Sequence, residues 1–345
     1  MDFDFSEEQS MLASSCERLV RERCGFEARR ALLKTDPATR PALWKDLCEL
    51  GVTALCVPED AGGLGRPLID GALVAQTLGR GWLLEPFIDS ALAAAMTLAG
   101  APASSARAEW LEGIASGERI VVPLADAQAQ GARTRGLAAH ASYADGVLVL
   151  VDGKLLLAPA KATKRRNYRQ FDGSAAAEVE FAAADAIVLG SGDVAQAAWQ
   201  AGRTAARVGR FAEGVGLSRT VLDSTAEYLR TRKQFGRTLS EQQVLQHRVA
   251  EHYRAWNSAR HLVRHALADW EAVQPKERER RVSAAKYMTG TAGRSIALDV
   301  LQLHGAIGLQ EETAISHYSK RLIGNDLLLG HAATHLGRFA AVDAV

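Results

Sequence analysis

The pattern of apolar and polar positions predicts that the chain begins with a run of helices. Ser6-Glu7-Glu8-Gln9 is a capping-box sequence, in which the Ser hydroxyl and the Gln side chain each satisfy a backbone amide at the start of a helix. Further helices are predicted from Pro41 to Gly51, over 69–80 and over 88–99. We therefore expect an N-terminal α-helical domain over residues 1–118.

The character of the pattern changes in the middle of the chain. Short apolar runs are bounded there by turn residues, as in small β domains. Asp152-Gly153 lies between two such runs and predicts a tight hairpin, because Gly tolerates the positive φ that the turn requires. We expect a small, antiparallel middle β domain over residues 119–196, with strands in Ile120–Leu124, Val147–Val151, Lys154–Leu157, Glu178–Phe181 and Ala186–Leu189.

From about residue 197 the apolar positions recur every three to four residues, as on the buried face of a helix. This periodicity predicts a C-terminal four-helix bundle domain over residues 197–345. The run Pro275–Arg281 reads as a solvated connector, and His304–Gly308 as a break between helices. The first of the four helices is expected to end near Leu229. The other three are expected to cover about 245–270, 282–303 and 312–342.

Composition and charge exclude several classes of function. The chain has 41 Lys and Arg against 40 Asp and Glu, and this balance argues against a nucleic-acid-binding protein. No window has the ~18 consecutive apolar residues of a membrane span. The acidic start lacks the basic region of a signal peptide, and all four cysteines lie in the first 56 residues without a C-x-x-C pair. We expect a cytoplasmic protein with no metal site.

The segment 228–243 is the strongest candidate for chemistry. A long helix is predicted to end at a cationic cluster, Gly236 turns the chain, and Ser240 is expected to cap the next helix. A helix N-terminus beside Arg232 favours a phosphate group, because free amides and a guanidinium would both face it. The alternative is a plain helical hairpin with solvated basic residues, in which Gln243 only closes a capping box.

Four motifs in order along the chain resemble the acyl-CoA dehydrogenase family. They are Phe3-x5-Gln9, Val57–Gly65, Arg232-x-Gln234-Phe235-Gly236 and Gln302–Gly308, and together they span nearly the full length. The resemblance implies a mainly α fold with a small β domain: an N-terminal helical domain, a β-barrel and a C-terminal four-helix bundle. It also implies FAD and α,β-desaturation of an acyl-CoA thioester, in which a carboxylate removes the α-proton and a hydride passes to the flavin.

The chain departs from this family at the catalytic base. The resemblance places the usual base Glu at Leu329 and its alternative position at Ala206, and neither residue can accept a proton. The Thr and Gln expected to follow the base are His331 and Ala333. The region 121–145 lacks the family's flavin-contacting motifs, so the β domain is expected to be reduced. The resemblance thus predicts no catalytic residue in this chain.

The nucleotide-binding half of the family pattern is retained. In the family's tetramers these segments clasp the pyrophosphate and adenosine of an FAD shared at a subunit interface. The chain therefore resembles the short, non-catalytic subunit of heteromeric dehydrogenases that act on steroid side-chain or pimeloyl-type acyl-CoAs. The implied partners are a longer catalytic subunit, in an α2β2 complex, and electron-transfer flavoprotein as acceptor. The implied cofactor-binding residues, hereafter the clamp residues, are Arg232, Gln234, Phe235, Leu239, Gln242, Gln243, Gln302, Gly305 and Ala306.

Two other readings stay open at this point. The chain could be a self-sufficient homo-oligomeric enzyme whose base has moved to Glu213 or Asp326. It could instead be a flavin-free structural paralogue. A solvated or ion-paired Glu213 is the plain alternative to a relocated base.

Overall fold

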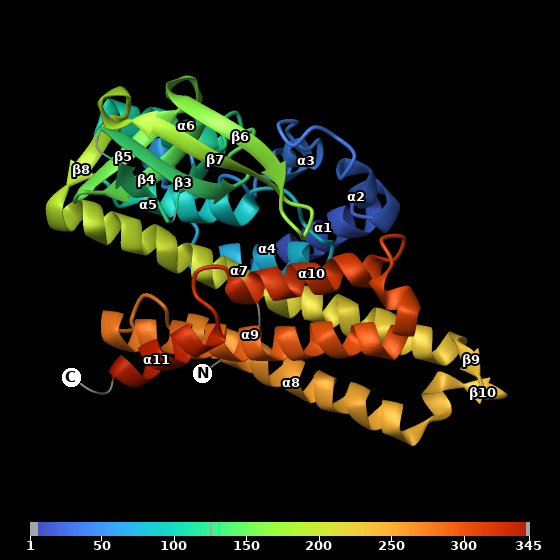
Figure 1. Ribbon diagram of the computed structural model, residues 1–345. Helices are drawn as coiled ribbons and strands as arrows, with labels where there is room; N and C mark the ends of the chain where they lie inside the picture. The colour runs from blue at the N-terminus through green and yellow to red at the C-terminus, as the bar shows by residue number, and fades with distance from the viewer. Residues whose placement is uncertain (1–5, 125, 131, 343–345) are drawn as a thin grey trace. The chain divides into compact units, whose positions relative to one another are not determined.

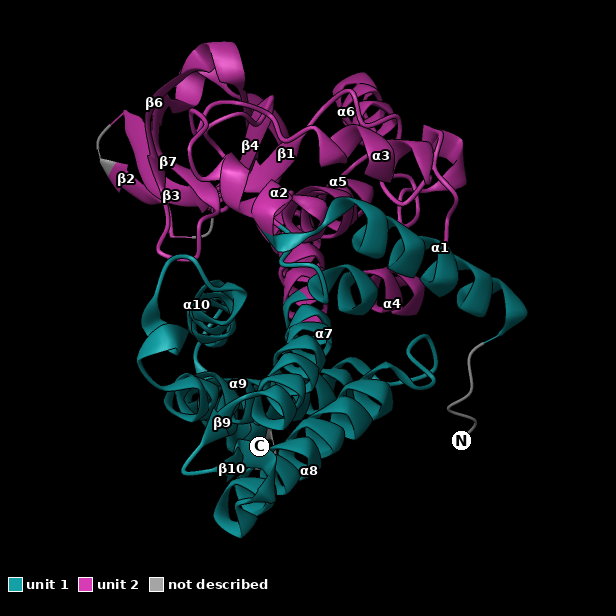
Figure 2. Cartoon of the chain, turned by 90° about the vertical axis from the view of Figure 1, so that its right-hand side faces the viewer, with its two compact units in different colours: residues 1–26, 75–83, 210–345 teal, residues 27–74, 84–209 magenta. Residues whose placement is uncertain are grey.

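The computed structural model describes residues 6–124, 126–130 and 132–342 (Figure 1). The chain forms two compact units, each built from segments that are far apart in the sequence (Figure 2). Unit 1 comprises 1–26, 75–83 and 210–345, and unit 2 comprises 27–74 and 84–209. The sequential division at 118 and 196 stays a prediction. Phe3 of the first family motif lies outside the described residues.

The predicted helices of the first part are present. In the capping box the Ser6 amide donates to Gln9 Oε1 at 3.1 Å, and the Gln9 amide donates to Ser6 Oγ at 3.2 Å, which confirms that prediction. The predicted helix over 88–99 divides into a fully buried π-helix, η2, followed by α5. The elements are α1 (Glu7–Arg23), α2 (Phe26–Leu32), α3 (Leu43–Glu49), η1 (Glu59–Ala61), α4 (Leu68–Gly79), η2 (Phe87–Ala94), α5 (Ala95–Ala99) and α6 (Ser105–Ala115).

Unit 2 contains two four-stranded sheets. One has the order β1-β4-β5-β8, and the other has the order β2-β3-β7-β6. The hairpin prediction is confirmed, since Asp152 and Gly153 both have positive φ and Val151 pairs with Lys154. The strands are β1 (Val121–Pro123), β2 (Gln128–Gln130), β3 (Arg133–Ala139), β4 (Gly146–Val151), β5 (Lys154–Pro159), β6 (Thr163–Arg169), β7 (Ala175–Ala182) and β8 (Ile187–Ser191).

The expectation of purely antiparallel pairing is wrong at one position. Strand β1 pairs with β4 in parallel, Val121 beside Gly146 and Pro123 beside Leu148. The chain leaves the first sheet after β1, forms β2 and β3 of the second sheet, and returns in the same direction. That crossover allows a parallel pair, which a direct hairpin cannot make.

The core of unit 2 lies between the first sheet and its helices. Trp110 and Leu111 of α6 pack with Leu148 and Leu157 of the sheet, and Trp199 joins them from α7 (Gly192–Thr231). Burying large aromatic and aliphatic side chains in one contiguous cluster is the main stabilising contribution to such a core. Helix α7 then continues into unit 1 from residue 210.

Unit 1 is a helical bundle. The central helix α9 (Pro275–His304) contacts α8 (Gln243–Leu267), α10 (Ala314–Leu327) and α11 (Ala332–Val342) (Figure 1). The predicted connector over 275–281 is wrong, because Pro275 begins α9 at a position where its missing N–H costs no helical hydrogen bond. Within the described residues no helix is both long and apolar enough to cross a lipid bilayer.

The prediction of one helix over 312–342 is also wrong. The chain breaks between α10 and α11, where Leu329 has φ 62° and Gly330 has φ 99°. The carboxylate Oδ1 of Asp326 accepts a hydrogen bond from the Ala332 amide at 3.1 Å. A side chain of α10 thus satisfies one of the free amides at the start of α11 and stabilises the break.

Candidate functional site

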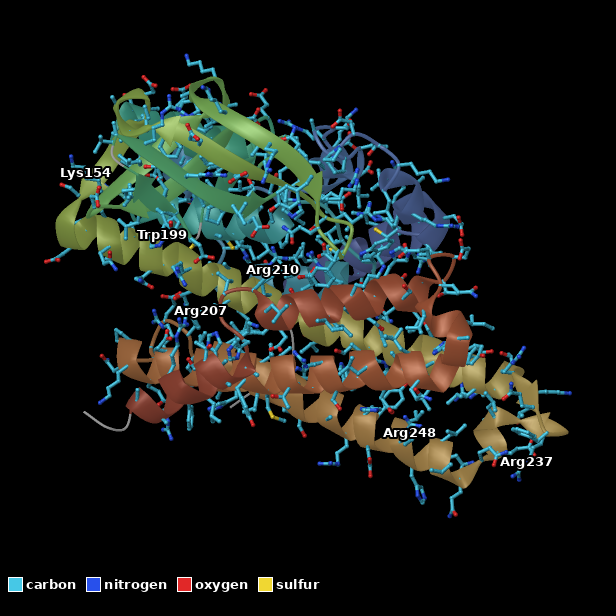
Figure 3. The ribbon with its side chains drawn as sticks, in the orientation of Figure 1. Lys154, Trp199, Arg207, Arg210, Arg237 and Arg248 are labelled. Carbon is cyan, nitrogen blue, oxygen red and sulfur yellow. The ribbon has the colours of Figure 1, made fainter. Side chains whose placement is uncertain are left out.

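The turn between α7 and α8 is a two-residue β-hairpin. Strands β9 (Lys233–Gln234) and β10 (Arg237–Thr238) pair across Phe235 and Gly236, whose φ angles of 54° and 80° fit a tight hairpin turn. The Phe235 side chain is 92% exposed. Figure 3 labels Arg237 at this hairpin. This ring is therefore accessible to another chain.

The prediction that Ser240 caps α8 is wrong, since Gln242 occupies the N-cap position of α8 and makes no side-chain capping hydrogen bond. Thr238 instead forms a capping box for the short helix that precedes α8: its amide donates to Glu241 Oε1 at 3.0 Å and its hydroxyl donates to the same atom at 2.7 Å. The hydrogen bond from the Thr238 hydroxyl, followed by that from the Thr238 amide, lowers the pKa of Glu241. Helix η5 (Leu239–Glu241) thus precedes α8. The carbonyl of Ser240 accepts from the Gln246 side chain at 2.7 Å.

The second clamp segment lies at the end of α9. Gly305 has φ 66° and ψ −150°, a conformation available in practice only to Gly, and it begins the short helix η6 (Gly305–Leu309). The Tyr228 ring, near the end of α7, stacks on His304 with ring centroids 4.3 Å apart. The Tyr228 hydroxyl also donates to the His304 carbonyl at 3.3 Å. The last turns of α7 and α9, which lead into the two predicted motifs, therefore lie side by side.

Most of the clamp side chains face solvent. Gln242 is half-buried, and its Oε1 accepts a hydrogen bond from Arg237 Nη2 at 2.7 Å. Arg232 is exposed and forms no ion pair within the described parts of the chain. Arg, Gln and bare backbone amides are the donors that phosphates and nucleotides use in proteins. Leu239 is half-buried like Gln242, and the exposed members are Arg232, Gln234, Phe235, Gln243, Gln302, Gly305 and Ala306.

The two positions that the family resemblance assigns to a base carry apolar side chains. Ala206 is buried on α7 in unit 2. Leu329 is half-buried in the turn between α10 and α11, and its carbonyl oxygen lies 3.1 Å from Nε2 of the buried His335. Within the described structure, neither position offers a group that can take a proton from a substrate.

Glu213 is held between two arginines in unit 1. Arg321 donates to Glu213 Oε1 from Nε at 2.9 Å and from Nη2 at 2.7 Å, and Arg210 Nη1 lies 3.1 Å from Oε2. All three side chains are at most 4% exposed. Because both carboxylate oxygens bind buried cations, this carboxylate acts as an ionic link between α7 and α10. That role leaves it poorly placed to serve as a base.

Asp326 is also occupied by structural contacts. Besides the Ala332 amide on Oδ1, its Oδ2 lies 4.0 Å from Arg294 Nη1. The carbonyls of Asn325 and Asp326 accept hydrogen bonds from the buried Lys286 Nζ at 2.8 and 3.0 Å. Asp326 therefore helps to close the end of α10.

Lys286 belongs to no sequence motif, yet it is a strongly perturbed group. It is 1% exposed, and burial lowers the pKa of its amine to about 8, although the nearby Asp326 acts in the opposite direction. Its spacing from Val282 and Thr289 puts it on the buried face of α9. A lysine at a position where the helical period predicts a buried apolar residue is the sequence signal that could have indicated Lys286.

Two family models match the chain over most of its length. Residues 6–118 match the model described as acyl-CoA dehydrogenase, N-terminal domain, and residues 197–342 match acyl-CoA dehydrogenase, C-terminal domain. Among curated proteins, acyl-CoA dehydrogenase IpdE2 of Mycolicibacterium smegmatis is 28% identical over 337 residues, covering 97% of this chain and 99% of that protein.

Solved structures show the same fold. The ChsE4-ChsE5 complex from Mycobacterium tuberculosis matches with a TM-score of 0.88 and 24% identity, covering 100% of this chain and 99% of the matched chain. A variant of the Tcur3481-Tcur3483 steroid ACAD matches with a TM-score of 0.87 and 23% identity, covering 98% of both chains. These likenesses confirm a mainly helical architecture with a small β region.

Proposed function

The chain belongs to the acyl-CoA dehydrogenase family, and from that premise we propose that it is the non-catalytic subunit of a heteromeric FAD-dependent acyl-CoA dehydrogenase. Its clamp residues would hold the pyrophosphate and adenosine of FAD at the interface with a longer subunit. That partner would supply the catalytic Glu. The observation that carries the proposal is the contrast between exposed clamp residues and base positions that hold only Leu329 and Ala206.

The surroundings of the two base positions support this assignment. A self-sufficient enzyme would need another carboxylate that is free to change its protonation state. Glu213 is bound by Arg210 and Arg321, and Asp326 is bound at the start of α11. Neither carboxylate is available without dismantling the contacts that join α7, α10 and α11.

The clamp residues fit the phosphate-bearing end of FAD. The exposed Arg232 guanidinium would bind the pyrophosphate, and the amides of Gln243 and Gln302 would orient the nucleotide. Gly305 has no side chain to block an approaching group, and Phe235 offers an apolar face for a neighbouring subunit. When bound, FAD supplies the hydride acceptor of the family's reaction. This chain's contribution is then to position the cofactor, and the proton transfer belongs to the partner.

The relatives indicate the substrate class. One of the matched structures is described as a steroid ACAD, and another is a complex of two chains. We accordingly propose an α2β2 complex that desaturates a bulky, steroid-derived acyl-CoA and passes its electrons to electron-transfer flavoprotein. A cytoplasmic location agrees with the four cysteines, none of which forms a disulfide.

The test compares the chain alone with the chain co-expressed with a longer dehydrogenase of the same source. We expect the purified chain alone to lack flavin, and the mixed complex to be yellow and to be bleached by its acyl-CoA. Arg232→Ala should lower the FAD content of the complex while the two chains still co-purify, because one charge-assisted phosphate contact of about 1.5–3 kcal/mol is lost. Flavin absorbance per mole of complex measures the effect.

Arg230→Ala is the matched control. Arg230 lies two residues away and is 68% exposed, but its Nη1 already lies 3.6 Å from Glu227. Its removal should leave the FAD content unchanged. A chain that binds and reduces FAD alone would establish the self-sufficient enzyme, and a mixed complex without any flavin would establish the structural paralogue. Either result contradicts the proposal.

A further inference from the structure

A polar cavity lies in unit 1, and none of the clamp residues line it. It has a volume of about 240 Å³ and lies between α1, the end of α4, α7 and α8. Beside the cavity α7 and the end of α4 approach each other closely, because a Cβ at Gly216 would stand 1.8 Å from the Gln76 carbonyl oxygen. The lining residues are Glu17, Gln76, Thr77, Arg80, Val215, Gly216, Arg219, Trp256, Arg260 and Arg264.

The charges around the cavity are unbalanced. Four arginines and one glutamate line it, a formal excess of three positive charges. Glu17 Oε1 lies 3.3 Å from Arg80 Nη1, and Asp223, outside the lining, binds Arg219 at 2.8 Å. Like charges gathered around one cavity repel one another, and a further anion would reduce this repulsion.

Arg260 shows the effect of this imbalance most directly. Its buried Nε has no hydrogen-bond partner within the described structure. Burial lowers the pKa of its guanidinium, and Arg264 and Arg219 lower it further. A buried N–H without an acceptor costs about 1–3 kcal/mol, so Arg260, which lines the cavity, would be stabilised by a nearby oxyanion.

Trp256 limits what the ligand can be. Arg219 and Arg260 both lie over its indole ring, at 5.0 and 5.2 Å from the ring centroid. Its Nε1 already donates to the Val215 carbonyl at 3.0 Å. With the ring covered by two guanidinium groups, it cannot act as a stacking platform for a nucleobase. The cavity therefore offers guanidinium N–H groups for a compact anion.

We propose that the cavity bounded by Arg80, Arg219, Arg260 and Arg264 is a binding site for a phosphate-type dianion. Either a free phosphate ion or a small phosphomonoester can supply this chemistry. The site shares no residue with the clamp, and its test measures phosphate binding and not dehydrogenase activity. Its failure can therefore be told apart from a failure of the proposed dehydrogenase role.

The experiment is calorimetric titration of the full-length chain with inorganic phosphate, at constant ionic strength set with sodium chloride. O-phosphoserine is titrated in parallel. We expect saturable binding of one phosphate per chain. Binding of both compounds identifies an open site that accepts phosphomonoesters, and binding of inorganic phosphate alone identifies a free-ion site. Absence of saturable binding for both compounds overturns the proposal.

Two substitutions should change the affinity for phosphate in opposite directions. Arg260→Met keeps an unbranched apolar stem beside Trp256 but removes the charge, and it should weaken phosphate binding roughly tenfold or more. Glu17→Gln removes the competing carboxylate from an exposed position and should strengthen binding about threefold. Arg254→Met, at an exposed position of α8 outside the cavity, is the matched control and should change nothing.

If circular dichroism shows that Arg260→Met does not fold, the direction in which Glu17→Gln changes the phosphate affinity still tests the proposal. Unspecific attraction to a positive surface would respond equally to Arg254→Met and to Arg260→Met. Equal responses of those two variants, or weaker binding by Glu17→Gln, would refute a built anion site.

Discussion

Replacing Glu213 with Gln separates a structural carboxylate from a catalytic one. The substitution keeps the size of the side chain and removes its charge. Arg210 and Arg321, which are 4% and 3% exposed, then lose the carboxylate that lies between them. Figure 3 labels Arg210 on α7. We expect a large loss of stability, because two buried cations lose their shared counter-ion.

The magnitude follows from the geometry. Three contacts of 2.7, 2.9 and 3.1 Å join the carboxylate to the two guanidinium groups. Breaking a buried ion pair by removing one partner costs about 3–5 kcal/mol, since the remaining charge is both desolvated and unpaired. For a chain of 345 residues that loss lowers the midpoint of thermal unfolding by about 4–7 °C.

The assay is thermal and urea unfolding followed by circular dichroism, with flavin content measured separately. Glu227→Gln is the matched control on the same helix, because Glu227 pairs with Arg230 at 3.6 Å and is 67% exposed. An exposed pair of this kind contributes less than about 1 kcal/mol. An unchanged unfolding midpoint for Glu213→Gln, together with lost activity of the complex, would falsify the structural role and point to a relocated base.

Three further predictions concern titration, reactivity and backbone entropy. The pKa of Lys286 falls from 10.5 to about 8 on folding, so between pH 8 and 10.5 the unfolded chain binds more protons than the folded chain. The free energy of unfolding of the wild type, measured with urea and compared with that of Lys286→Met, should therefore rise with pH across that window by up to about 3 kcal/mol. Burial raises the pKa of the Cys16 and Cys56 thiols to about 12, so at pH 8 both should react with a disulfide reagent only as fast as the chain unfolds. Fast modification of the native chain would contradict their burial. Gly337 lies in α11 with open space where a Cβ would stand, so Gly337→Ala should raise the free energy of unfolding by about 0.5–1 kcal/mol, and a lower midpoint in urea would show an unforeseen contact.

Features set by neighbouring residues could be predicted from the sequence. The capping box at Ser6 and Gln9 and the hairpin at Asp152-Gly153 depend on side chains and φ preferences within four residues. The hairpin after Arg232 and the break at Gly305 are of the same kind. The clamp residues themselves come from the family resemblance and stay a prediction, and the stacking of Tyr228 on His304, which brings their two segments together, was not predictable from either segment alone.

Features set by distant contacts could not be predicted. Strand β3 (Arg133–Ala139) begins with polar and small residues, and Leu137 is its one large apolar residue, so its identity as a strand comes from pairing along β7. The break at Leu329 forces a positive φ on a bulky residue, and Asp326 and His335 stabilise it from other turns of the chain. A continuous helical period could not reveal either contact.

The arginine cavity was missed for a related reason. Its charged groups come from four separate elements, so no window of sequence contains more than two of them. Arg260 and Arg264 are four residues apart on α8 and share one helical face. That spacing was the one local sign of a cationic surface, and Arg80 and Arg219 join it only in the folded chain.

The outward position of Phe235 has a consequence for the association of this chain with another. A benzyl ring that is 92% exposed forgoes about 2–3 kcal/mol of hydrophobic stabilisation for as long as water surrounds it. Covering the ring on assembly with the proposed partner subunit would recover that free energy. The two-residue turn would then contribute to association through one side chain that makes no contribution to the core of its own chain.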